Sequence, residues 1–146
     1  MSSFGASVSA NLVATWNGSA WSALGTGPIT TGMTGASVQA GVVFNNAVWV
    51  GLGYSSNFGN TKTLQAFQTA WLGQGTVTGA YDALAVRLGT STTNSYVFGA
   101  YHDAANVVTV HGYNPVTGSV LSINTPPASV APTRCQQLFV RGTGLN

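Results

Sequence analysis

Short apolar segments alternate with turn signals along the whole chain, most clearly in residues 95–123. Within this stretch, β-branched and aromatic residues form short runs at 97–98, 107–110 and 120–123. Turn-forming residues separate these runs: a polar turn at 102–106, and the sequence NPVTG at 114–118. Short β-forming runs between turns rich in Gly, Pro, Asn and Asp are typical of an antiparallel meander. Residues 95–123 therefore predict consecutive antiparallel strands.

The same pattern recurs with a period of about 50 residues, a length typical of repeat architectures. Glycines that close the second strand of each unit recur at spacings of 46 and 48 residues, at Gly5, Gly51 and Gly99. Residues that begin an outer strand recur at spacings of 50 and 49 residues, at Trp21, Trp71 and Val120. The chain is therefore predicted to be a repeat protein.

The predicted strands fall into four groups. Residues 1–27 predict three strands, at 4–9, 12–16 and 21–24, while residues 36–75 and 80–124 predict four strands each, and residues 133–146 predict one, at 134–140. Asn17-Gly18 and Asn45-Asn46 are hairpin signals, because both residue types tolerate the positive φ of tight turns. No segment has the apolar period of about 3.6 residues that marks a helix. We therefore predict an all-β fold.

Three features of each repeat resemble a blade of the kelch-type (galactose-oxidase-like) propellers: a glycine near the end of the second strand, a turn before the outer strand, and a tryptophan that begins it. In this chain they are Gly51 and Gly99, YNPVTG at 113–118, and Trp21 and Trp71. The segment 125–134 is similar to the linker that leads into a next blade. The resemblance covers nearly the whole chain and implies four-stranded antiparallel blades, three per chain.

The predicted strands add up to twelve, or three blades, whereas propellers have typically about four to eight. Residues 1–27 form a partial blade that lacks its first strand, and residues 133–146 supply a first strand with nothing after it. We therefore predict a homodimer that closes a six-bladed ring. The strand at 134–140 of each copy completes the N-terminal blade of the other, which removes an aggregation-prone edge. The alternatives are an open half-ring and an engineered or excised propeller fragment.

Very low charge limits the partners of this protein. The 146 residues include four Lys or Arg and two Asp or Glu, giving a formal net charge of +2. Nucleic-acid binding needs a clustered basic surface, and these cations are scattered, so we expect no nucleic-acid partner. The first ten residues lack the basic and apolar parts of a secretory signal. No apolar run approaches the roughly 18 residues of a membrane span, so we expect no membrane partner.

Titratable residues are too few to predict a catalytic, cofactor or metal site. His102 and Asp103 are adjacent, but they fall in the predicted turn at 102–106, where we expect them to be solvated. A metal site needs three or four converging ligands. The chain has two carboxylates in total, so we expect no paired-carboxylate mechanism within one chain. Cys135 has no predicted neighbouring base, and we expect it to pack as a small hydrophobic residue. The copper chemistry of galactose oxidase is therefore not expected here. Elemental analysis that found a stoichiometric transition metal would contradict this prediction.

Aromatic residues are the candidate ligand contacts, because their faces stack on sugar rings. The candidates are Trp16, Trp49, Tyr54, Tyr101 and His102. For Trp21, Trp49 and Trp71, the repeat positions also fit packing between blades. Trp16, beside the Asn17-Gly18 turn, is the tryptophan expected to be exposed.

The sequence favours a non-enzymatic structural or binding protein over an enzyme. Low charge, surfaces of Gly, Ser, Thr and Asn, and predicted self-assembly favour a virion component such as a phage decoration, fibre or tail-associated protein, so we expect a virion or extracellular location. Its partners would be itself, other virion proteins or glycans. The alternative is a carbohydrate-binding, lectin-like propeller with ligand sites in grooves between blades. We also expect Arg134 to be partly buried, with its guanidinium bonded to loop carbonyls.

Overall fold

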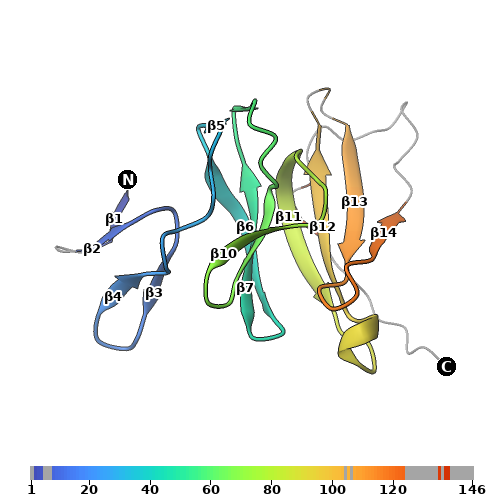
Figure 1. The fold of residues 1–146 in the computed structure, drawn as a ribbon, viewed down its shortest axis with the longest axis horizontal. Coiled ribbons are helices and arrows are strands. Elements are labelled where there is room, and N and C mark those ends of the chain that lie inside the picture. The colour runs from blue at the N-terminus through green and yellow to red at the C-terminus, as the bar shows by residue number, and fades with distance from the viewer. Residues whose placement is uncertain are drawn as a thin grey trace.

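The computed structural model describes residues 2–4, 8–103, 105, 107–123, 135, 137 and 138 (Figure 1). Within these residues the protein is all-β, apart from one turn of 3₁₀ helix at Thr92–Asn94 (η1). Two four-stranded antiparallel sheets form most of the fold. The predicted all-β class is therefore confirmed.

The first sheet contains residues from 37 to 74. Its strands are β6 (Ser37–Phe44), β7 (Ala47–Gly53), β9 (Leu64–Phe67) and β10 (Trp71–Gln74), which lie in the order β10-β9-β7-β6. Asn45 and Asn46 join β6 to β7 with φ values of 51° and 55°. Two consecutive positive φ values match the twist of a two-residue hairpin turn, so this predicted turn is present. The short strands β5 (Met33–Thr34) and β8 (Ser56–Asn57) pair beside the sheet.

The second sheet repeats this topology with residues from 80 to 123. Its strands are β11 (Ala80–Arg87), β12 (Tyr96–His102), β13 (Val108–Tyr113) and β14 (Val120–Ile123), in the order β11-β12-β13-β14. In both sheets each strand pairs antiparallel with the strands that precede and follow it in the meander. Asn114 fixes the turn between β13 and β14, where its side-chain oxygen accepts the amide protons of Val116 and Thr117.

The N-terminal residues form two strand pairs rather than the predicted set of three strands. β1 (Ser2–Phe4) pairs with β2 (Val8–Ala10), and β3 (Ala14–Trp16) pairs with β4 (Trp21–Ala23). The segment 4–9, predicted as one strand, therefore reverses direction, because Phe4 and Val8 lie opposite each other. Gly5, taken as a strand position by analogy with the later repeats, lies outside the described residues.

The first sheet lies between the N-terminal strands and the second sheet (Figure 1). Alternation along β7 produces this layering, because successive side chains of a strand point to opposite faces. One face of the first sheet packs against N-terminal residues in a cluster that contains Val50, Leu52, Trp71, Val13, Leu24 and Met33. The other face packs against the second sheet in a cluster that contains Phe44, Ala47, Trp49, Leu64, Ala66, Tyr81 and Val97.

Two of the repeated glycines are explained by the packing of one ring. Tyr81 is buried between the two sheets. A Cβ atom at Gly51 of the first sheet would lie 2.7 Å from the Cβ of Tyr81, and one at Gly99 of the second sheet would lie 2.2 Å from the ring. Any side chain at either position would have to displace the tyrosine. Both glycines therefore face Tyr81, but they are not equivalent positions of the repeat. The residue that follows the irregularity in the first strand pairs with Gly51 in the first sheet (Ala40) and with Ala100 in the second (Ala83).

The two sheets contact each other through β11, which packs against β6 and β7. Their outer strands are more exposed: Leu72 of β10 is 61% exposed and Leu121 of β14 is 42% exposed. The sheets are thus packed most closely at their first strands.

The segment at 134–140 was predicted to be a strand. Its described residues, Cys135, Gln137 and Leu138, are not in a strand. The rest of the segment lies outside the described residues, and so does Arg134, whose predicted burial stays a prediction.

Candidate functional site

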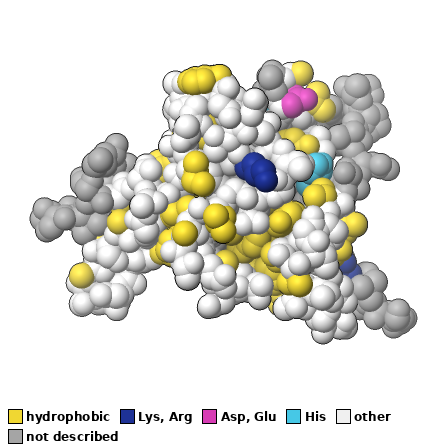
Figure 2. Space-filling model, viewed as in Figure 1, with side chains coloured by type: hydrophobic (Ala, Val, Ile, Leu, Met, Phe, Trp, Pro, Cys, Tyr) yellow, Lys and Arg dark blue, Asp and Glu magenta, His cyan; other side chains and the backbone are white. Residues whose placement is uncertain are grey.

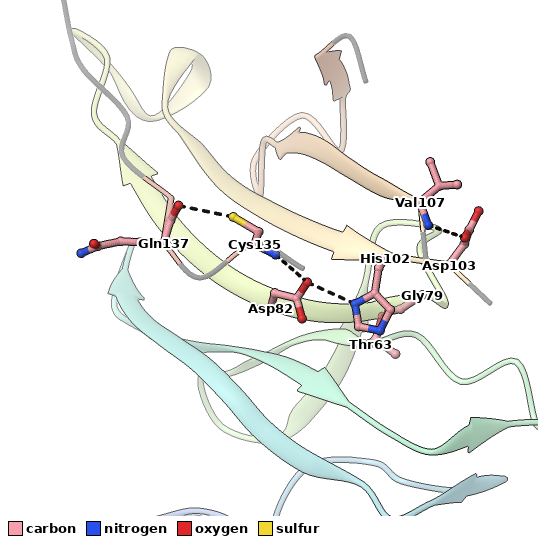
Figure 3. Close-up of polar contacts among 8 residues, drawn as sticks. All are labelled: Thr63, Gly79, Asp82, His102, Asp103, Val107, Cys135 and Gln137. Carbon is pink, nitrogen blue, oxygen red and sulfur yellow. Dashed lines mark hydrogen bonds and ion pairs between the residues drawn. The ribbon is translucent and has the colours of Figure 1, made fainter. Parts of the chain in front are cut away.

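His102 and Asp82 form a buried pair in the second sheet (Figure 3). His102 ends β12, and its Nδ1 atom lies 3.1 Å from Oδ2 of Asp82 on β11. The two side chains are 9% and 6% exposed. An ionised carboxylate can only accept a hydrogen bond, so an ionised Asp82 pairs with the His102 tautomer whose Nδ1 atom carries the proton. The predicted solvated turn at 102–106 is therefore wrong for His102, which belongs to the strand.

A β-bulge places Asp82 beside His102. The register of β11 against β12 shifts between Tyr81 and Ala83, so Asp82 is the extra residue. Such a bulge re-aims a side chain relative to regular alternation. The sequence prediction considered Asp103 as the partner of His102 and missed Asp82. The available signal was an acidic residue inside an otherwise apolar strand.

Cys135 joins the same group through its backbone. Its amide donates to Oδ2 of Asp82 at 3.1 Å, whereas its Sγ donates to the carbonyl of Gln137 at 3.3 Å. Figure 3 shows the thiol directed toward Gln137 and away from His102. This geometry does not place a nucleophile against a base. The arrangement holds Cys135 against the second sheet.

Asp103 organises the loop that follows β12. Its Oδ1 atom accepts the amide protons of Ala105 and Val107, at 2.9 and 3.0 Å. Carboxylates of this kind replace backbone hydrogen bonds in tight loops. Asp103 and His102, adjacent in sequence, therefore have separate partners.

Tyr101 and His111 form an aromatic cluster with Tyr81 between the sheets. The Tyr101 hydroxyl lies 3.3 Å from Nε2 of His111, and the two rings meet edge to face with centroids 5.0 Å apart. Nδ1 of His111 has no hydrogen-bond partner within the described part of the chain. Burial lowers the pKa of His111 and raises that of Tyr81. Tyr101, a predicted ligand contact, is half-buried in this cluster.

Trp49 and Tyr54, also predicted as ligand contacts, are engaged within the fold. Trp49 is 3% exposed, and its Nε1 donates to the carbonyl of Phe44 at 3.1 Å. The hydroxyl of Tyr54 donates to the carbonyl of Thr78 at 2.6 Å, which ties β7 to the segment between the two sheets. Burial raises the pKa of Tyr54, and the negative charge of Asp103 adds to this effect.

Trp16 is the most exposed of the four tryptophans, at 52%. It lies opposite Trp21 on the β3–β4 hairpin, and their ring centroids are 5.4 Å apart. The side-chain oxygen of Asn17 accepts the amide protons of Ser19 and Ala20 and so closes the turn. The hairpin predicted at Asn17-Gly18 is present, with a loop of four residues between the paired tryptophans.

A cleft of about 180 Å³ opens between the two sheets at the end of β9 and β10. We call it the inter-sheet cleft. Its lining comes from the first sheet and its turns, apart from one residue of the second sheet, Pro115: Asn45, Ala47, Trp49, Ala66, Gln68, Thr69, Ala70, Leu72, Gln74 and Pro115. Of the predicted ligand contacts, the cleft contains Trp49 alone. The face in Figure 2 shows hydrophobic side chains gathered along the junction between the sheets, with charged side chains in isolated spots.

The described residues contain no group of three or more His, Cys, Asp or Glu side chains that could hold a metal ion. No helix in the described part of the chain is long and apolar enough to cross a membrane. Comparison with family models, with curated proteins and with solved structures finds no match for this chain. The class that the structure defines is an all-β protein of stacked four-stranded antiparallel sheets.

Proposed function

We propose that the protein is a non-enzymatic scaffold whose sheets are propeller blades, and that two copies close a ring. The observation that carries this proposal is the stacking of two equivalent meanders through their first strands, with β11 against β6 and β7. Blades of a propeller are arranged in this way around a central axis. The N-terminal strands, which pack on the opposite face of the first sheet, are the proposed third blade.

The position of Cys135 supports closure by a second copy. Its amide bonds to Asp82 on β11, the first strand of the second sheet. In a propeller, the first strand of the next blade lies beside this strand. We propose that this segment pairs as a strand with strands of a second copy, because an unpaired strand edge attracts another strand. The N-terminal strands of a second copy, which lack a first strand of their own in the predicted blade, are the proposed partner.

A virion is the setting that we propose for this scaffold. The support is compositional: six charged side chains in 146 residues leave a surface of neutral polar groups suited to packing against other copies. Co-sedimentation of the protein with assembled particles tests this setting, and a protein that stays in the supernatant under all conditions contradicts it.

Oligomeric state tests the ring. Light scattering on the intact chain should report a dimer, because the proposed ring closes only between copies. Deleting residues 134–146 removes the proposed exchanged strand, and the product should be insoluble or open-ended. Deleting residues 142–146 alone is the matched control and should leave the dimer intact. A compact, soluble monomer of the intact chain at micromolar concentration would refute the ring.

A further inference from the structure

The inter-sheet cleft has the size of a site for one small ligand. Its volume of about 180 Å³ lies below the roughly 300–1,000 Å³ of pockets that enclose drug-sized molecules. Gln68, Thr69 and Ala70 in the β9–β10 turn form one side, and Pro115 of the β13–β14 turn forms the other. Asn114 fixes the turn that contains Pro115, and the bond from Trp49 to Phe44 holds the β6–β7 hairpin that supplies Asn45 and Ala47. The cleft is thus largely preformed.

The polar groups of the cleft are all neutral. They are the side chains of Asn45, Gln68, Thr69 and Gln74, and the lining contains no Lys, Arg, His, Asp or Glu. Gln74 is oriented by the hydroxyl of Tyr113, which donates to its Oε1 at 3.2 Å. Within the described residues, the amides of Asn45 and Gln68 make no hydrogen bond to another protein group, so both can donate to and accept from a ligand.

The remaining lining is apolar: Ala47, Trp49, Ala66, Ala70, Leu72 and Pro115. A neutral lining disfavours phosphates and carboxylates, which need a positive partner to replace their hydration. A purely apolar ligand would gain nothing from the amides of Asn45 and Gln68, which are exposed and would stay hydrated. A sugar ring satisfies both requirements, since its hydroxyls donate and accept hydrogen bonds and one of its faces presents C–H groups to apolar side chains.

We propose that the inter-sheet cleft binds a single ring of a neutral sugar. Asn45, Gln68 and Gln74 hydrogen-bond the hydroxyls, while Leu72 and Trp49 contact the C–H face. This inference goes beyond the scaffold role and does not depend on ring closure, because every lining residue comes from one copy of the chain. A free monosaccharide and the terminal residue of a glycan present the same chemistry, and the experiment separates them.

Titration calorimetry and amide-detected NMR of the intact protein test the site. The probes are glucose, galactose, mannose and N-acetylglucosamine, each free and as the terminal residue of an oligosaccharide, with sialic acid as the charged control. At least one neutral probe should bind, with shifts of the Asn45 and Gln68 side-chain amides, and sialic acid should not. Tighter binding of the oligosaccharide than of its free sugar would assign the site to glycan ends, and equal binding to free sugars.

Two variants locate the binding. Gln68→Ala should weaken it about fivefold or more, as expected for loss of one hydrogen-bonding group, and Ala70→Trp should abolish it by filling the cleft. Gln39→Ala, on the exposed part of β6 outside the cleft, is the matched control and should bind as the wild type does. Light scattering confirms that each variant keeps the state of assembly of the wild type. Binding unchanged in both cleft variants, binding of sialic acid alone, or no binding of any neutral probe would overturn the proposal.

Discussion

Gln65 provides the sharpest test of how the N-terminal segment is attached to the first sheet. Its side chain on β9 is fully buried. The Oε1 atom accepts the amide proton of Ile29 at 2.7 Å, and Nε2 donates to the carbonyls of Ile29 and Lys62 at 2.6 and 3.0 Å. One amide side chain therefore satisfies three backbone groups, two of them on a segment 36 residues away.

Gln65→Glu changes this group with almost no change of shape. The carboxylate can still accept from the amide of Ile29 but cannot donate to either carbonyl. Each buried group left unsatisfied costs about 1–3 kcal/mol, so two lost donations should lower the free energy of unfolding by about 2–6 kcal/mol at neutral pH. Burial raises the pKa of the introduced carboxyl. Its protonated form can donate to one carbonyl, so the loss should be smallest at acid pH and grow as the pH rises through the folded-state pKa.

Urea titration at several pH values measures this effect. Gln68→Glu adds the same charge at an exposed position on the next turn and is the matched control, which should change stability by less than about 0.5 kcal/mol. If Gln65→Glu is as stable as the control at neutral pH, the three hydrogen bonds do not hold the N-terminal segment in place and the reasoning fails.

Three further predictions concern single sites. Gly27→Ala should lower the melting temperature more than Gly18→Ala does. Both glycines have positive φ, but a Cβ at Gly27 would lie 2.3 Å from a backbone oxygen, whereas one at Gly18 meets nothing within 4 Å. Equal decreases in melting temperature would contradict the clash. Trp71→Phe should lower the free energy of unfolding by about 1–3 kcal/mol in urea titration, because it removes part of a buried ring and the hydrogen bond from Nε1 to the carbonyl of Leu24. An unchanged midpoint would contradict this prediction. Burial lowers the pKa of His111, so its neutral form is favoured in the folded protein and stability should fall as the pH drops below the ordinary value of 6.5; His111→Gln should weaken that dependence, and an identical pH profile would contradict it.

The strands of the two four-stranded sheets could be predicted from sequence because their signals are local. β-branched and aromatic runs bounded by turn residues predicted four strands each in residues 36–75 and 80–124. The four strands of each sheet lie within these ranges. The Asn45-Asn46 turn was predictable for the same reason, since positive φ is tolerated by few residue types.

The N-terminal strands and the contacts of His102 were not predictable, because they depend on residues distant in sequence. Nothing in the run at 4–9 distinguishes one strand from two halves of a hairpin, since register there is decided by pairing and not by local propensity. The burial of His102 depends on Asp82, which is 20 residues away and is brought close by a bulge. The turn residues at 102–106 predicted a loop that includes His102. In the structure β12 extends to His102, because this residue still pairs with Val108 of β13.

The bulge that redirects Asp82 shows what the repeat does and does not determine. Both sheets have an irregularity at the same place in their first strand, between Val38 and Ala40 in β6 and between Tyr81 and Ala83 in β11. In the first sheet the extra residue, Gln39, packs where a Cβ at Gly53 would stand. In the second sheet the position equivalent to Gly53 is His102, and the extra residue is its partner Asp82. The repeated backbone thus supplies the same local geometry twice, but only the second sheet places charged groups there. Asp82 also accepts a hydrogen bond from the amide of Cys135. The charged pair that distinguishes the second sheet from the first therefore lies beside the segment that we propose pairs with a second molecule.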